Sequence, residues 1–307
     1  MSQRNGGTRR LLLPIIVALV FVAGAATMLY PSAAMWFHQA RESEQIARYA
    51  GEMHQLPRDG LTEALGAAHA YNDALLGGVA TVGAFQSVPS SEGAAAVSDY
   101  DELLAASATG LMARIKIPTI GVDLPIYHGT SDATLLRGVG HLEGTALPVG
   151  GASTHAVLTG HRGLADAELF TRLDALEVGD TFVIEVFDDV LTYRVASTRI
   201  VDPDQTESLY PVAGQDLVTL VTCTPLGINT QRILVTGERI TPTPIRDIEA
   251  AGAAPTVPGF PWWAVIFAAV VAAAVVYVLL QARPRGRRRV APPQAPHRPE
   301  HVTGIIG

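Results

Sequence analysis

Two long runs without a charged residue constrain the fold of this chain more than any other feature. The first covers residues 11–30 (LLLPIIVALVFVAGAATMLY) and the second covers residues 260–280 (FPWWAVIFAAVVAAAVVYVLL). An α-helix needs about 20 apolar residues to cross the hydrocarbon core of a bilayer. We therefore predict two transmembrane helices, with residues 31–259 between them on one side of the membrane.

The placement of arginines predicts which side that is. Three arginines precede the first run, five follow the second, and no Arg or Lys lies between residues 246 and 283. Basic flanks stay in the cytoplasm, so we predict a cytoplasmic N-terminus (1–10), a basic, Pro-rich cytoplasmic tail (281–307) and an extracellular segment between the helices. A cleaved signal peptide is the alternative for the first run, although that run exceeds the roughly 7–15 apolar residues of a usual signal core.

The segment between the two runs is strongly acidic. It contains 13 Arg or Lys and 28 Asp or Glu, a formal charge of −15. Such a segment repels the phosphates of nucleic acids. We therefore predict no nucleic-acid partner and no tight binding to an anionic surface.

The first part of this segment, residues 31–104, has a helical pattern followed by a loop. Residues 35–76 repeat apolar side chains at intervals of three and four, and Pro57 with Gly60 separates two helices. Residues 77–99 are rich in Gly, Ser and Ala and have no clear period. We predict two helices and then a mobile loop that is a candidate lid.

Residues 105–245 have the pattern of an all-β domain. Turn signals separate short β-branched runs, and one short helix is predicted at about 165–176. Seven or eight short strands in about 130 residues are typical of a closed β-barrel or a sandwich. Residues 246–259 then form a Pro-, Ala- and Gly-rich linker. The seven clear strand runs are ARIKIP, GVDLPIY, HAVLTG, DTFVIEVF, LTYRVASTRIV, DLVTLVTC and QRILVTGERI.

Cys223 is the only cysteine and ends one of these strand runs. An unpaired thiol in an oxidising compartment is a liability unless it reacts, and a buried cysteine acting as a small apolar residue is the structural alternative. A nucleophilic cysteine acts as a thiolate, with its pKa lowered from about 8.5 by a base or a cation.

Arg232 begins the next strand run, so a hairpin returns it toward Cys223. There an arginine can stabilise charge on an acyl oxygen, and a surface arginine on an edge strand is the alternative.

The histidine partner of such a cysteine must come from elsewhere in the strand region, which contains His128, His141, His155 and His161. His161 is the best candidate, because it follows the run HAVLTG and has glycines on both sides that expose its ring. A structural role is the default alternative for a lone histidine. The sequence contains no phosphate-binding loop, no H-E-x-x-H and no paired cysteines for zinc, so we predict no cofactor and no metal.

These segments together resemble a known family. TLVTCTPLGINTQRILVTGER resembles the active-site segment of sortases, and HAVLTGHRG resembles their histidine segment. LPIYHGT, GVGHLEGTALPVGG, LFTRLDALEVGD and the two flanking apolar runs resemble class C, the pilin-polymerising sortases of Gram-positive bacteria. The resemblance covers about residues 40–245.

The resemblance implies a fold, a site and a reaction. The fold is the eight-stranded sortase β-barrel. Cys223 is the nucleophile, His161 the general acid and base, and Arg232 the residue that stabilises the oxyanion or orients the substrate, with Thr222 helping to line the site. The reaction is a transpeptidation: the cysteine cleaves an LPXTG-type sorting signal between Thr and Gly through a thioester, and a pilin lysine resolves it.

One departure from class C and three rival functions accompany this interpretation. Class C sortases commonly carry a lid with an Asp-Pro-aromatic stretch, and residues 77–104 contain no Asp-Pro. A housekeeping sortase that anchors proteins to a peptidoglycan precursor is the first rival. A transpeptidase of peptidoglycan stems is the second, although its usual pattern places Arg two residues after Cys, where this chain has Pro225. An inactive barrel that serves as an assembly scaffold is the third.

Overall fold

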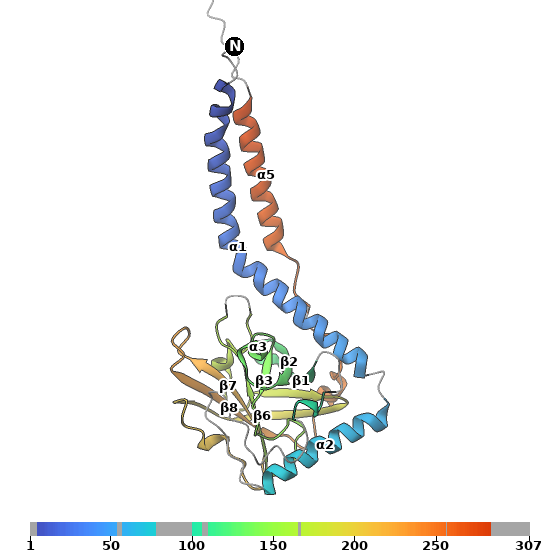
Figure 1. Ribbon diagram of the computed structural model, residues 1–307. Helices are drawn as coiled ribbons and strands as arrows, with labels where there is room; N and C mark the ends of the chain where they lie inside the picture. The colour runs from blue at the N-terminus through green and yellow to red at the C-terminus, as the bar shows by residue number, and fades with distance from the viewer. Residues whose placement is uncertain are drawn as a thin grey trace, which may run out of the picture. The chain divides into compact units, whose positions relative to one another are not determined.

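Figure 1 shows the computed structural model of the protein, which describes residues 5–53, 57–77, 100–105, 110–164, 167–255 and 257–283. The chain divides into two compact units. One unit comprises Met1–Met28 and Val265–Gly307, and the other comprises Leu29–Ala264. Helix α1 (Asn5–Met53) begins in the first unit and ends in the second.

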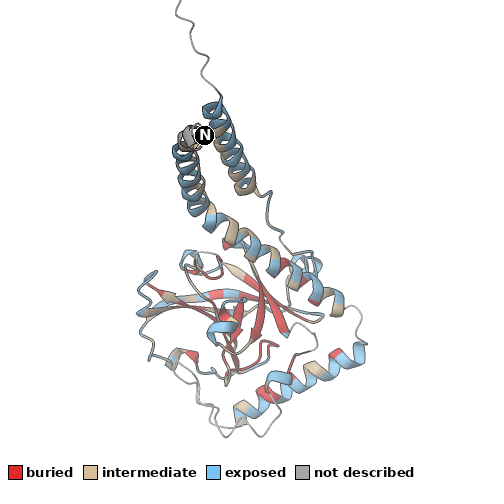
Figure 2. Ribbon diagram, turned by 45° about the horizontal axis from the view of Figure 1, so that its top comes forward, coloured by how far each residue is buried: buried red, intermediate tan, exposed pale blue. Residues whose placement is uncertain are grey.

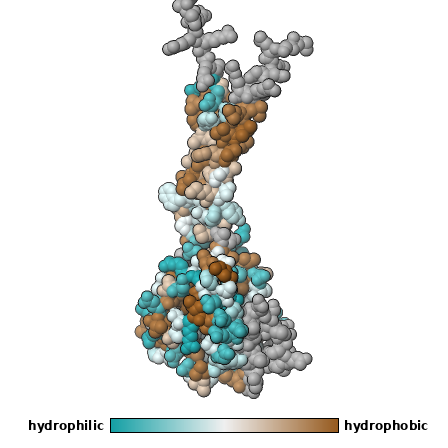
Figure 3. Space-filling view, turned by 90° about the vertical axis from the view of Figure 1, so that its left-hand side faces the viewer, coloured by the Kyte–Doolittle hydropathy of each residue, from teal (hydrophilic) through white to brown (hydrophobic). Residues whose placement is uncertain are grey.

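The first unit contains the apolar part of α1 and most of α5 (Trp262–Ala282), which lie side by side in Figures 1 and 2. Large apolar side chains on both helices are exposed, including Leu13 at 69%, Phe21 at 64% and Leu279 at 60%. Figure 3 shows hydrophobic patches on the surface of this helix pair. Both helices are long and apolar enough to cross a membrane, as the sequence predicts.

The second unit is built on a closed barrel of eight strands in the order β1-β2-β3-β4-β7-β8-β6-β5. Neighbouring strands are antiparallel except in the pairs β2–β3 and β4–β7, which are parallel. The ring closes where β1 pairs with β5, so no strand of the barrel presents an open edge. The predicted all-β barrel is therefore confirmed. The strands are β1 (Leu111–Ile117), β2 (Val122–His128), β3 (Val139–His141), β4 (Thr154–Thr159), β5 (Thr181–Val186), β6 (Asp189–Val201), β7 (Asp216–Thr224) and β8 (Gln231–Arg239).

Alternate side chains of the strands fill the barrel. Phe182 and Tyr193 are fully buried there, and their rings stack with centroids 5.4 Å apart. Gly237 leaves room for this pair, because a Cβ at that position would lie 2.5 Å from the ring of Phe182. The other alternate side chains of β4, β7 and β8, which point away from the barrel interior, contribute to a smaller outer cluster. The buried members of this outer cluster are Leu142, Val157, Leu209, Val221 and Leu234.

The end of α1 and helix α2 (Arg58–Gly77) pack on the barrel. Figure 2 shows buried positions on both helices where they lie along it. The hydroxyl of Tyr49 on α1 donates to the carbonyl of Met112 at 3.4 Å and accepts from the amide of Phe187 at 3.2 Å. The predicted helices at 35–76 are present, but the first of them is the end of α1 and continues the apolar helix instead of being separate from it. Pro57 precedes α2, and its carbonyl accepts a bond from the amide of Leu61.

The structure differs from the sequence-based expectations at three places. The predicted helix at 165–176 is wrong where it is described: η4, a 3₁₀ turn, covers only Leu173–Ala175. Residues 246–259 are not a free linker, because helix α4 (Ile245–Glu249) and the chain after it bond to the barrel, with Arg114 donating to the carbonyl of Ala253 at 2.8 Å. The eighth strand, β3, is only three residues long. Most of the predicted lid loop, residues 78–99, lies outside the described residues.

Candidate active site

Cys223 is the second-last residue of β7, and its thiol is free and partly exposed. Strand alternation puts Cys223 on the same face as Val221, which belongs to the outer cluster rather than to the barrel interior. The cysteine therefore lies at the end of the barrel on its outer surface, as expected for a nucleophile that must meet a peptide.

Arg232 lies directly opposite Cys223 in the antiparallel ladder of β7 and β8. Opposite residues of such a ladder point to one face, with Cβ atoms about 4.5–5.5 Å apart. The Arg232 guanidinium donates to the carbonyls of Asn229 at 2.9 Å and Gln231 at 3.0 Å, which hold it against the connecting turn. The hairpin predicted from the sequence therefore places a fixed positive charge beside the cysteine.

The parallel pairing of β4 and β7 brings the strand that precedes His161 alongside the strand that carries Cys223. Thr159 of β4 pairs with Val221, and the amide of Gly160 still donates to the Val221 carbonyl at 3.0 Å. β4 ends at Thr159, and His161 comes two residues later, so the ladder brings the start of the histidine loop beside the end of the cysteine strand. The cysteine strand thus has the histidine loop after one neighbouring strand and Arg232 on the other.

The two glycines beside His161 hold close contacts. A Cβ on Gly160 would lie 2.7 Å from Cδ2 of Phe170, whose ring is fully buried. Gly163 has a φ of +73°, and a Cβ there would lie 2.3 Å from Cδ1 of Leu226 in the turn after β7. The glycines therefore let the histidine loop pack against Phe170 and against the cysteine hairpin, a close approach that adds to the exposure inferred from the sequence.

The other three histidines of the strand region have structural environments. His155 is 1% exposed, donates from Nδ1 to the Tyr210 carbonyl at 3.1 Å and accepts at Nε2 from Thr219, and burial lowers its pKa. His141 is fully buried, and burial lowers its pKa to about 4. Burial also lowers the pKa of His128, whose Nε2 donates to the Leu103 carbonyl at 2.6 Å. His161, in contrast, is partly exposed and follows the strand that pairs with the cysteine strand.

Thr222 does not have the lining role predicted for it. Its side chain is 0% exposed, and its hydroxyl donates to the carbonyl of Gly160 at 2.7 Å. A buried hydroxyl that is already bonded to the main chain is not presented to a substrate. The structure therefore favours a role for Thr222 in joining the cysteine strand to the histidine loop.

Sequence reasoning missed Arg162. This side chain is 12% exposed and bonds to Thr171, Thr224 and Asp174. The only signal in the sequence is its position directly after His161, since the partners lie 9 to 62 residues away.

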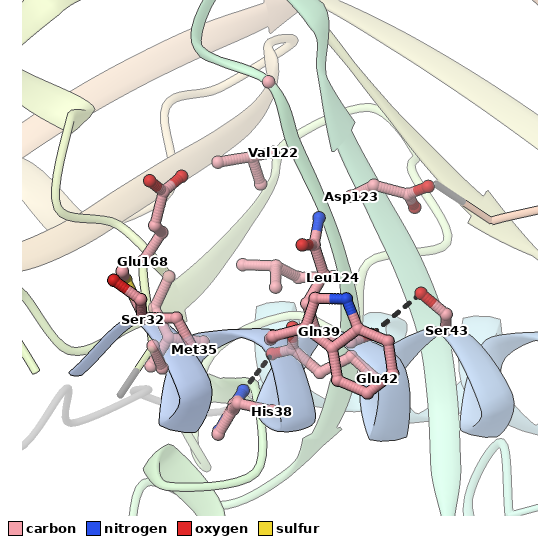
Figure 4. Close-up of a pocket in the computed structure, with 14 residues that line it drawn as sticks. Ser32, Met35, His38, Gln39, Glu42, Ser43, Val122, Asp123, Leu124 and Glu168 are labelled. Atoms are coloured by element: carbon pink, nitrogen blue, oxygen red, sulfur yellow. Dashed lines mark hydrogen bonds and ion pairs between the residues drawn. The ribbon is translucent and has the colours of Figure 1, made fainter. Parts of the chain in front are cut away.

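A cavity of about 290 Å³ lies away from these residues, between α1, the start of β2 and the loop at Ala167–Leu169 (Figure 4). His38 Nδ1 and Glu42 Oε1 are 3.3 Å apart on its α1 wall. Burial raises the pKa of Glu42, and the neighbouring His38 partly opposes that shift. Among the residues that the structure describes, no group of three His, Cys, Asp or Glu side chains could hold a metal ion.

Comparison with known proteins identifies the barrel. Residues 115–240 match the family described as the sortase domain, and this stretch contains Cys223, His161 and Arg232. Sortase C-1 from Actinomyces oris is 46% identical to this chain, with a TM-score of 0.54 over 59% of this chain and 98% of that one. The chain belongs to the sortase family.

Further similarities to known sortases narrow the comparison to one class of the family. Sortase C1 from Streptococcus agalactiae is 39% identical, with a TM-score of 0.58 over 65% of this chain and all of that one. Sortase D from Bacillus subtilis is 32% identical over 130 residues, which is 41% of this chain. That match covers 63% of the Bacillus protein, so the aligned part of this sortase spans less than two thirds of that relative. The structural neighbours are class C sortases.

Proposed function

We propose that this sortase is a membrane-anchored transpeptidase that cleaves an LPXTG-type sorting signal between Thr and Gly and joins the new acyl group to a lysine amine of a pilin. The observation that supports the proposal is the direct pairing of Cys223 with Arg232 in the β7–β8 ladder, next to β4, which leads into the loop with His161. The similarity to class C sortases supports the pilin substrate.

The three side chains can serve both the acylation and the transfer step of the proposed reaction. In the first half the Cys223 thiolate attacks the Thr carbonyl carbon, a C–S bond forms and the C–N bond to Gly breaks, while His161 donates a proton to the leaving nitrogen. In the second half the lysine amine attacks the thioester and loses a proton to His161, and the thiolate leaves. The Arg232 guanidinium stabilises the negative oxygen of both tetrahedral states.

The membrane anchors suit an acceptor that is displayed on the cell surface. The placement of the arginines predicts that both termini are cytoplasmic and that the barrel is outside. An outer barrel meets sorting signals of exported proteins as they emerge from the membrane.

The test uses the full-length chain in detergent micelles, beside its Cys223→Ala variant. Each is mixed with an LPXTG-bearing peptide and either a lysine-bearing or an oligoglycine acceptor, and intact masses are followed. We expect a wild-type adduct equal in mass to the peptide cut after Thr, followed by a product joined to the lysine acceptor. Cys223→Ala should form neither.

Other outcomes would redirect the proposal. A product with oligoglycine and none with lysine would favour the housekeeping reaction over pilus assembly. No adduct and no product with either acceptor would contradict cysteine transpeptidation and favour an assembly scaffold.

A further inference from the structure

Arg162, which follows His161, has an unusually complete set of partners for a loop arginine. Its Nε donates to the Thr171 carbonyl at 3.1 Å, one terminal nitrogen donates to Thr224 Oγ1 at 2.9 Å, and the other donates to Asp174 Oδ2 at 2.6 Å. The side chain is 12% exposed, whereas Asp174 is 52% exposed. A nearly buried cation is therefore paired and hydrogen-bonded in three directions.

The bond to Thr224 joins the two halves of the site. Thr224 follows Cys223 in the chain, just as Arg162 follows His161. On the preceding side, the Thr222 hydroxyl donates to the Gly160 carbonyl at 2.7 Å. Two hydrogen bonds therefore join the histidine loop to the cysteine strand. One joins the residues that precede His161 and Cys223, and the other joins the residues that follow them.

Three further hydrogen bonds, one of them from Arg162, connect the two ends of the histidine loop. Its Nε holds the Thr171 carbonyl, the Gly163 amide donates to the Thr171 hydroxyl at 3.0 Å, and the Phe170 amide donates to the His161 carbonyl at 3.1 Å. One guanidinium therefore ties the loop that carries the histidine both to the turn at Thr171 and to the cysteine strand.

We propose that Arg162 is a positioning residue that sets the His161 imidazole at the level of the Cys223 thiol. This inference rests on the proposed function, since it concerns the same pair. The planar guanidinium presents a rigid fork of donors, so it serves three acceptors in different directions at once. A lysine presents a single ammonium on a flexible stem and cannot span Thr171, Thr224 and Asp174 together.

The first test measures kcat, KM and thiol reactivity of the full-length chain with Arg162→Gln and Arg162→Lys. Misplacing a reacting group by about 1 Å costs on the order of 100-fold in rate, so we expect kcat to fall about 10- to 100-fold in Arg162→Gln, while KM for the sorting peptide stays within about threefold. Arg162→Lys should recover only part of the loss.

The pH dependence of Cys223 alkylation separates positioning from general destabilisation, because it needs no substrate. The profile of Arg162→Gln should approach that of His161→Ala, in which the thiol has lost its partner. Arg194→Gln is the matched control, because Arg194 is an exposed arginine of β6 whose loss leaves this loop intact. It should keep the wild-type profile.

A second pair of variants keeps the proposal falsifiable if Arg162→Gln does not fold. Thr224→Val removes the acceptor at constant volume, whereas Thr224→Ser retains a hydroxyl. We expect the valine variant to shift the alkylation profile in the direction of His161→Ala and the serine variant to resemble wild type. Wild-type kcat and profile in Arg162→Gln and Thr224→Val would overturn the positioning role alone. No adduct on the wild-type chain would instead overturn the proposed function, and the positioning role with it.

Discussion

Gly160 and Gly163 flank His161, and each occupies a position where a side chain has no room. The proposed catalytic residues can be recognised from their functional groups. The two glycines affect the site only because they lack a side chain. Phe170 lies against Gly160 and Leu226 lies against Gly163. The histidine loop therefore packs on an aromatic ring at one glycine and on the cysteine hairpin at the other.

Gly160→Ala should therefore destabilise the protein and slow the formation of the thioester. Its Cβ would lie 2.7 Å from Phe170, and overpacking a buried contact typically costs about 1–3 kcal/mol in the free energy of unfolding. Thermal unfolding and single-turnover acylation measure the two effects. Adding Phe170→Leu should recover part of the acylation rate by making room for the new methyl group.

Gly66→Ala is the matched control for this change. Gly66 is an exposed residue inside α2, with no atom within 4 Å of an added Cβ. Alanine is favoured over glycine by up to about 1 kcal/mol in a helix interior, so this variant should be slightly stabilised and fully active. If Gly160→Ala behaved in the same way, the close packing against Phe170 would be without consequence.

Arg232→Gln should lower kcat much more than it raises KM. Removing one donor to a developing oxyanion costs about 100- to 1,000-fold in kcat, and we expect a loss in that range. Arg232→Lys keeps the positive charge but not the planar fork, so an intermediate rate is expected. Steady-state transfer of a labelled sorting peptide gives both constants, and an unchanged kcat in Arg232→Gln would remove the arginine from the mechanism.

Among the elements, β3 is the one that strand patterns do not reveal. Three residues give no alternation to count, yet β3 completes the ring between β2 and β4. A buried polar group marks it instead. His141 donates from Nε2 to the Ala146 carbonyl at 2.8 Å and accepts at Nδ1 from the hydroxyl of Tyr100, also at 2.8 Å. The neutral ring thereby joins β3 to the short turn η2 (Tyr100–Glu102).

This buried histidine predicts a loss of stability in acid. Its pKa is about 4 in the folded protein, against about 6.5 when unfolded. Between those values the unfolded chain binds more protons, so the free energy of unfolding falls as the pH falls from about 6.5 to about 4. The total contribution is on the order of 3 kcal/mol.

His141→Gln is the variant that isolates this contribution, because glutamine retains one donor and one acceptor. We expect the slope of unfolding free energy against pH between 4 and 6.5 to be smaller in the variant. His128 and His155 are also buried with lowered pKa values, so a residual slope should remain. Identical slopes in the two proteins would show that His141 does not titrate as described.

The elements also show what could be predicted from the sequence and what could not. The Cys223–Arg232 pairing follows from a local hairpin, and strand patterns are sufficient for it. The alignment of His161 with Cys223 depends on the parallel pairing of β4 and β7, which joins distant segments and leaves no local signal. At 165–176 the sequence predicts a short helix. There the burial of Phe170 against Gly160 and the bond from Arg162 to Thr171 override that propensity.

In the whole molecule, an aromatic group lies where the chain enters and leaves the barrel unit. The Trp36 indole donates to the Gly259 carbonyl at 2.7 Å, and the rings of Trp36, Phe37 and Trp263 have centroids 5.2 to 6.4 Å apart. Tryptophan is enriched where membrane helices reach the aqueous interface. The contact between Trp36 and Trp263 places the first and last parts of the barrel unit next to each other.

The single thiol makes this orientation testable without altering the barrel. A maleimide too polar to cross a bilayer should label the wild-type chain in intact cells and leave Cys223→Ala unlabelled, because the barrel is predicted to be outside. Ser2→Cys in the Cys223→Ala chain should be labelled only after lysis. Labelling of that variant in intact cells would place the N-terminus outside and contradict the predicted topology.

The order of the strands in the chain also determines when the site can first exist. Cys223 and Arg232 lie on β7 and β8, the last two strands to be synthesised, and β8 joins β7 to β6 in the ring. The chain is synthesised from its N-terminus and a domain generally folds as a unit, so the histidine loop is made before the nucleophile. The thiol therefore acquires both neighbours only when the final strand is in place, and a chain that stalls before β8 has no assembled site.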